Sequence, residues 1–107
     1  MPRAKTLKVK KRRMEILRLL AEKEKMTTAE IADALDISLS SARYSLMELE
    51  VKGLVRNKKS GYGKQGIRCI WELASPLSNF SKDFLKFLLD NFTDDEIIFM
   101  LEVGMVR

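Results

Sequence analysis

The sequence lacks histidine and contains a single cysteine, Cys69. Histidine is the general base that enzymes use most often, and one cysteine completes neither an intrachain disulfide nor a common zinc site. No pairing of a nucleophile with a base is evident either. We therefore expect a protein that is not an enzyme and that uses no metal or cofactor. Cys69 is interpreted as a small buried residue rather than a redox sensor.

Long apolar runs are also missing. No stretch of about 18 or more apolar residues occurs, so a membrane-spanning helix is not expected. The N-terminal stretch MPRAKTLKVKKRR is basic and lacks the apolar core of a signal peptide, which favours a cytoplasmic location. The chain has 107 residues, of which 46% are hydrophobic. That is enough for one small domain with a modest core.

The most informative segment spans residues 26–54 and predicts two short helices joined by a tight turn. Thr27 is followed three residues later by Glu30, which is the spacing of a capping box at the start of a helix. Ser38 is placed to cap the second helix, and Gly53 is placed to end it. The core-facing side of this second helix is predicted to carry Ala42, Leu46 and Leu49.

The flanking segments predict a third helix and two strands. Residues 10–25 carry apolar side chains at helical spacing, and residues 54–57 and 67–73 have the pattern of strands. Residues 58–66, KKSGYGKQG, are interpreted as a flexible basic loop between the strands. The expected fold is therefore mainly α with a small antiparallel β-wing, which is a winged helix-turn-helix, followed by C-terminal helices.

With this order of elements, the chain resembles the winged helix-turn-helix superfamily of DNA-binding proteins. It is most similar to the small prokaryotic regulators of the multiple-antibiotic-resistance and arsenical-resistance types. The likeness covers roughly residues 10–73 and rests on positions 14–20, 28–32, 35, 37–38, 41–43, 46, 49, 53–55 and 70–73. It implies a dimeric transcription regulator that binds double-stranded DNA sequence-specifically, from a prokaryotic or viral source.

Winged helices also serve other partners, so two alternatives remain open. The first is a protein-interaction module in a larger transcription or replication assembly. The second is an RNA-binding winged helix.

The distribution of charge favours nucleic acid. Residues 1–25 carry ten Lys or Arg against three acids, and residues 51–73 carry six against one. These clusters flank the helix predicted at 38–52, which would enter the major groove while the arm and the wing contact adjacent phosphates or the minor groove. The candidate DNA contacts are Ser38, Ser40, Ser41, Arg43 and Tyr44 in this recognition helix, Lys58, Lys59, Tyr62, Lys64 and Gln65 in the wing, and Lys10, Lys11, Arg12 and Arg13 in the arm.

The last third of the chain, residues 74–107, is predicted to form helices that are apolar around most of their circumference. Such helices offer more apolar surface than one small core can cover, so we expect them to form a homodimer. This divides the chain into a basic arm at 1–9, a winged helix-turn-helix domain at 10–73 and a dimerisation segment at 74–107. The candidate interface residues are Phe80, Phe84, Phe87, Leu88, Phe92, Ile97, Ile98 and Leu101.

Two groups of acidic residues have simpler interpretations than a catalytic site. Asp94, Asp95 and Glu96 follow Thr93, which predicts a capped helix start whose acids favour the helix dipole. Glu48 and Glu50 are interpreted as part of a solvated helix face.

Overall fold

Five α-helices and a three-stranded antiparallel sheet make up the part of the chain that the computed structural model describes. This part covers the backbone of residues 2–63 and 66–104 and the side chains of residues 9–58 and 69–104. The elements follow the order α1 (Pro2–Lys23), β1 (Met26–Thr27), α2 (Thr28–Leu35), α3 (Leu39–Val51), β2 (Val55–Gly63), β3 (Gly66–Leu73), a short 3₁₀ helix η1 (Leu77–Asn79), α4 (Lys82–Asn91) and α5 (Asp94–Glu102). The expected fold class is confirmed.

The helix starts that the sequence predicts are present as capped ends. The Glu30 amide donates to Thr27 Oγ1 over 3.1 Å, and the Thr27 amide donates to the Glu30 carboxylate over 2.8 Å, which completes the capping box of α2. Ser38 caps α3 by accepting a hydrogen bond from the Ser41 amide. Gly53 has φ +82°, a left-handed conformation that suits glycine just after a helix.

The core forms where α1, α2 and α3 pack together under the sheet. Its members include Ile16 and Leu17 of α1, Ile31 of α2, and Leu46 and Leu49 of α3, all of them fully buried. A polar contact ties the sheet to this core, because the Trp71 indole N–H on β3 donates to Thr28 Oγ1 at the start of α2 over 2.9 Å. The position of α2 relative to the sheet is thereby set by both packing and a hydrogen bond.

The wing is longer than the sequence predicts. The residues that were expected to form a flexible loop, 58–66, lie mostly in β2 and β3, which pair from Val55↔Leu73 out to Gly63↔Gly66. The prediction of a nine-residue loop was therefore wrong for most of its length, because the strand hydrogen bonds continue through a glycine-rich and lysine-rich sequence. The two-residue strand β1, which pairs with β3 through Met26↔Trp71, was not predicted either.

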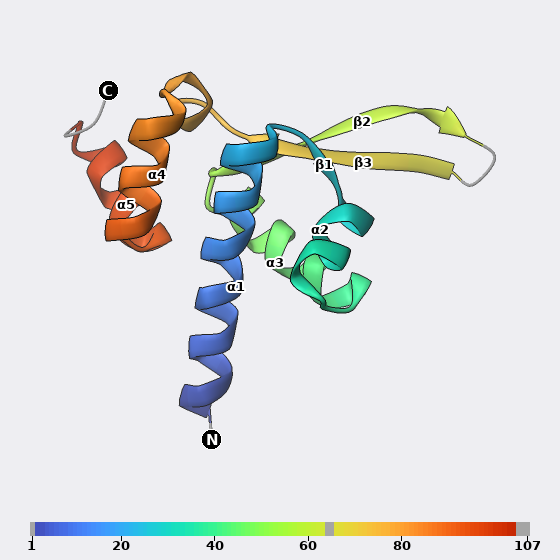
Figure 1. Ribbon diagram of the computed structural model, residues 1–107, viewed down its shortest axis with the longest axis horizontal. Coiled ribbons are helices and arrows are strands. Elements are labelled where there is room, and N and C mark those ends of the chain that lie inside the picture. Colours follow the sequence, from blue (N-terminus) through green and yellow to red (C-terminus); the bar gives the residue numbers. More distant parts are fainter. Residues whose placement is uncertain (1, 64–65, 105–107) are drawn as a thin grey trace.

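Figure 1 shows the hairpin of β2 and β3 projecting from the helical body, while α4 and α5 lie on the opposite side. The molecule is accordingly flat, with extents of 45 × 38 × 22 Å. Helix α1 begins at Pro2 rather than at the predicted Lys10, so residues 2–9 continue the helix instead of forming a separate arm. None of the helices in the described part of the chain combines the length and the apolar character that crossing a membrane would need.

Candidate nucleic-acid interface

Helix α3 has one buried face and one exposed face. Ala42, Ser45, Leu46 and Leu49 are buried against the core, which confirms the predicted apolar side. On the other side, the predicted contact residues Ser40, Arg43 and Tyr44 are all exposed. Among the described side chains, no carboxylate forms an ion pair with Arg43, so its guanidinium is available to an anionic partner.

Two of the predicted contact residues, Ser38 and Ser41, are engaged with each other. Ser38 Oγ accepts from the Ser41 amide over 3.1 Å and donates to Ser41 Oγ over 2.9 Å. Their hydroxyls stabilise the start of α3. The structure thus gives both serines a local role, which leaves Ser40, Arg43 and Tyr44 as the freer polar groups on this part of the helix.

The exposed face of α3 also carries large apolar side chains that were not among the predicted contacts. Met47 is 54% exposed and Val51 is 89% exposed, and with Tyr44, which is 60% exposed, they form a line along the helix. Positions 40, 44, 47 and 51 repeat at the spacing of one helix face, so this signal is present in the sequence. The contacts predicted from the sequence on this helix were polar or aromatic residues, and Met47 and Val51 were not among them.

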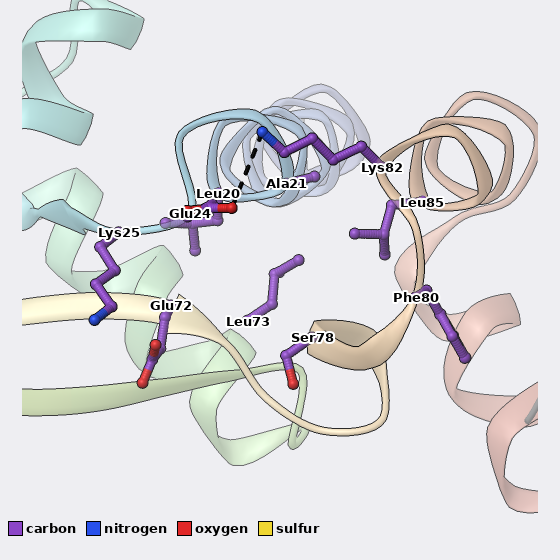
Figure 2. Close-up of a pocket in the computed structure, with 10 residues that line it drawn as sticks. All are labelled: Leu20, Ala21, Glu24, Lys25, Glu72, Leu73, Ser78, Phe80, Lys82 and Leu85. Atoms are coloured by element: carbon purple, nitrogen blue, oxygen red, sulfur yellow. Dashed lines mark ion pairs between the residues drawn. The ribbon is translucent and has the colours of Figure 1, made fainter.

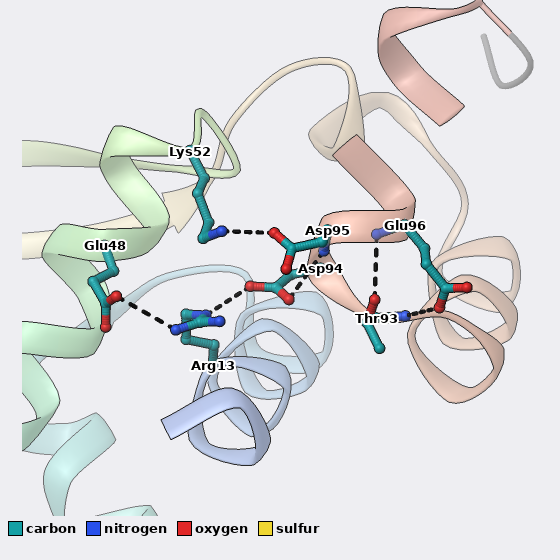
Figure 3. A network of polar contacts seen from close by, with 7 residues as sticks. All are labelled: Arg13, Glu48, Lys52, Thr93, Asp94, Asp95 and Glu96. Atoms are coloured by element: carbon teal, nitrogen blue, oxygen red, sulfur yellow. Dashed lines mark hydrogen bonds and ion pairs between the residues drawn. The ribbon is translucent and has the colours of Figure 1, made fainter. Parts of the chain in front are cut away.

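Arg13 is not available to DNA in this structure, which corrects its assignment to the arm. Only 6% of it is exposed, and its Nε donates to Asp94 Oδ2 over 2.7 Å while Nη1 lies 3.4 Å from Glu48 Oε2 (Figure 3). A guanidinium carries several N–H donors in a fixed planar geometry that matches carboxylates, so it is well suited to a buried ion pair. Of the other residues predicted on this helix, Lys10 and Lys11 are exposed and Arg12 is partly exposed.

The contacts of Arg13 belong to a network that links three helices. Lys52, directly after α3, donates to Asp95 of α5 over 2.7 Å. This hydrogen bond holds the pKa of Asp95 below its ordinary value. Asp94 is buried and Glu48 is partly buried, so Glu48 does not belong to a solvated face as predicted. The predicted capping box of Thr93 and Glu96 is present at the start of α5 (Figure 3).

In the wing, Lys58 is exposed and Arg56 forms an ion pair with Glu72 of the neighbouring strand over 2.9 Å. The backbone of Lys59 and Tyr62 lies in β2, and their side chains fall outside the described residues. Lys64 and Gln65 lie outside the described residues altogether. Cys69 on β3 is partly buried and packs against the core.

The predicted dimer residues divide into three groups, which are buried, exposed and partly buried. Leu88 and Ile97 are buried inside the chain's own core, so they are not available to a second copy, which corrects that part of the prediction. Phe84 and Phe87 are exposed, as are Phe99 and Val103, which the predicted set did not include. The remaining residues, Phe80, Phe92, Ile98 and Leu101, are partly buried and pack against the core.

A pocket of about 240 Å³ lies where the end of α1, the end of β3 and the start of α4 meet (Figure 2). Leu20, Leu73 and Leu85 form part of its wall, and Lys82 at its rim lies 4.0 Å from a carboxylate oxygen of Glu24. Acidic and basic side chains both line the rim, so the pocket shows no net preference for a charged ligand.

Helices α1, α2 and α3 are followed by the antiparallel hairpin of β2 and β3, and α3 begins with a capped end. This arrangement defines a winged helix-turn-helix. Residues 11–57 match the family model described as a helix-turn-helix domain. That match covers less than half of the chain.

Solved structures of regulators are similar to the chain over most of its length. A mutant of ZitR from Lactococcus lactis in the apo form is 21% identical with a TM-score of 0.58, covering 92% of this chain and 69% of that one. A transcriptional regulator homologue from Pyrococcus horikoshii OT3 is 23% identical with a TM-score of 0.56, covering 73% and 72%. FabT from Streptococcus pneumoniae in complex with DNA is 18% identical with a TM-score of 0.52, covering 87% and 68%. No curated protein matches the chain by sequence. At these identities the likeness establishes the shared fold.

Proposed function

We propose that this protein binds double-stranded DNA sequence-specifically and acts as a dimeric transcription regulator. The observation that carries the proposal is the exposed face of α3, where Arg43 stands unpaired among the described side chains beside Ser40 and Tyr44. A capped helix with a polar, cationic N-terminal half is what a helix-turn-helix inserts into the major groove. The similarity to FabT, whose structure contains DNA, supports the same use of the fold.

In the proposed mechanism, the helix at 38–52 enters the major groove by its N-terminal half. Arg43 is the main direct reader, since arginine donates to the paired acceptors on a guanine edge. The exposed cations on neighbouring elements, Lys10 and Lys11 of α1 and Lys58 of β2, contact phosphates on either side. Arg13 is excluded from this set because it is buried with Asp94.

The first experiment is selection of bound sequences from a random duplex library. A dimer would place two α3 helices about 34 Å apart, one turn of the duplex, so we expect a pseudo-palindromic consensus. A consensus with a single half-site would argue against the dimer, and no enrichment at all would overturn sequence-specific binding.

The first prediction concerns Arg43. Replacing it in Arg43→Ala should cost about 1–3 kcal/mol of binding free energy for the selected site and relax the preference for one base pair. Binding isotherms on the selected duplex and on its single-base variants measure both effects. Lys23→Ala is the matched control, because Lys23 is an exposed cation at the opposite end of α1 from Lys10 and Lys11. Full affinity and unchanged preference in Arg43→Ala would remove Arg43 as a reader.

A second candidate function is docking of a partner protein in a larger assembly. The exposed apolar residues Met47 and Val51 on α3 favour it, because such side chains are common at protein interfaces. Salt-dependent binding to duplex DNA separates the two functions, since contacts to phosphates weaken steeply with salt. Competition between duplex DNA and RNA tests the RNA-binding alternative in the same assay.

A further inference from the structure

The exposed face of α3 combines a weak hydrogen-bonding capacity with a strong apolar character. Ser40, Tyr44, Met47 and Val51 follow one another along a single side of the helix, and Tyr44, Met47 and Val51 are each more than half exposed. Arg43 and Met47 are four residues apart, so their side chains are neighbours on the helix surface. The cationic side chain of Arg43, which can bind a base edge or a phosphate, thus lies next to the apolar side chain of Met47.

Few polar groups remain on this helix to read bases. Ser38 and Ser41 are used in the cap of α3, and Glu48 lies beside Arg13 toward the interior. Base reading by hydrogen bonds therefore depends on Ser40, Arg43 and the Tyr44 hydroxyl. One or two bidentate contacts alone would distinguish only a small number of base pairs.

The major groove offers one apolar group to a reading helix, the C5-methyl of thymine. We propose that Met47 and the ring of Tyr44 contact thymine methyl groups and thereby select particular A·T pairs beside the base that Arg43 reads. This inference rests on the proposed function, because it requires α3 to lie in the major groove. It adds the chemistry by which the recognition helix chooses its site.

Met47 and Val51 differ in how far they lie from the N-terminal end of α3. At a rise of about 1.5 Å per residue, Met47 lies roughly 10 Å along the axis from Ser40, whereas Val51 lies roughly 16 Å away. The major groove is about 12 Å wide, and a helix of this class contacts bases from its N-terminal end. Val51 is thus placed beyond the base edges, and it is a natural control for Met47.

The decisive experiment replaces the thymines of the selected duplex by deoxyuridine, one at a time, and measures binding of the full chain. Deoxyuridine pairs as thymine does but lacks the methyl group. At a contacted thymine the affinity should fall about four-fold, which is the effect of one buried methyl-sized group. Thymines outside the contact should show no change.

Variants of the protein assign the effect to its residues. In Met47→Ala, the response to deoxyuridine at one thymine should disappear, while Val51→Ala should keep it. Tyr44→Phe removes the hydroxyl and keeps the ring, so its response to deoxyuridine should match that of the wild type.

Three results would overturn the inference. The wild type could bind the selected duplex and its deoxyuridine forms equally, or Met47→Ala could keep every deoxyuridine response. In either case DNA binding itself stands. The first result removes the thymine contact, and the second removes its assignment to Met47. Binding to no duplex at all would overturn both the inference and the proposed function.

Discussion

At the scale of single residues, Arg13 shows how burial decides the role of a charge. Its position in a run of basic residues predicted contact with DNA, yet its side chain lies among Asp94 and Glu48 inside the molecule. Asp94 is 81 positions away in the sequence, and no local pattern reveals such a partner. By contrast, the exposure of Arg43 followed from helical spacing alone, because the opposite face carries the apolar residues.

Removal of Arg13 should destabilise the protein strongly. In Arg13→Ala, the Asp94 carboxylate would remain buried without its cation, and breaking such a pair costs about 3–5 kcal/mol. Urea unfolding monitored by circular dichroism measures the loss. The control is Arg56→Ala, which breaks an exposed ion pair with Glu72 and should cost about 1 kcal/mol or less. Equal stability of the two variants would show that the Arg13 pair contributes no more than a surface pair.

Replacing Ser45, on the buried side of α3, should stabilise the protein. Its side chain is fully buried, and among the described residues its hydroxyl has no hydrogen-bond partner. Because a buried hydroxyl without a partner is unfavourable and alanine has the higher helix propensity, Ser45→Ala should stabilise the protein by about 1 kcal/mol. The same unfolding assay tests this, and a destabilised Ser45→Ala would show that the hydroxyl makes a favourable contact.

At the scale of elements, the helix starts were predicted correctly from short sequence patterns, whereas the pairing of strands was not. The caps at Thr27, Ser38 and Thr93 follow from short spacings in the sequence, and all three are present. The extent of the wing depends on hydrogen bonds between β2 and β3. Glycine and lysine are uncommon in strands, so their presence at 58–66 predicted a loop instead. Strand β1 has only two residues and exists because Met26 lies opposite Trp71, which sequence periodicity cannot show.

The wing is expected to attract DNA without reading its sequence. Lys58 is an exposed cation on β2, so Lys58→Ala should weaken binding to all duplexes to a similar degree. The slope of log affinity against log salt concentration should become shallower by about one unit, the change expected for one lost phosphate contact. Titrations at four or more salt concentrations measure it, with Lys23→Ala, at an exposed cation near the end of α1, as a control that keeps the slope. A wild-type slope in Lys58→Ala would place this part of the wing away from DNA.

At the scale of the whole molecule, α5 joins the C-terminal helices to the recognition helix. The bonds of Asp94 to Arg13 and of Asp95 to Lys52 hold the start of α5 against α1 and the end of α3 (Figure 3). Further along, α5 exposes Phe99 and Val103, and α4 exposes Phe84 and Phe87. An assembly through this apolar surface would therefore be connected to α3 through helices fixed by ion pairs.

The exposed phenylalanines are the basis of the last prediction, that two copies of the chain associate through α4 and α5. Buried aromatic side chains dominate the energy of many interfaces, so Phe87→Ser combined with Phe99→Ser should convert the dimer to a monomer in sedimentation equilibrium. Both side chains are exposed in the single chain, and the fold should survive the change. Val51→Ser, an exposed apolar residue on α3, is the matched control and should leave the mass unchanged.

The same variant tests whether DNA binding depends on the dimer. Linked half-sites raise the effective concentration of the second α3, so the double substitution should weaken binding to a two-half-site duplex more than to a single half-site. Equal weakening of both would indicate damage to the winged helix itself, and intact Trp71 fluorescence would argue against that damage. A wild-type protein that sediments as a monomer at concentrations on the order of tens of micromolar would contradict the dimer. The apolar surface of α4 and α5 would then belong to a different protein partner, because Phe87 and Phe99 are not covered by the chain's own core.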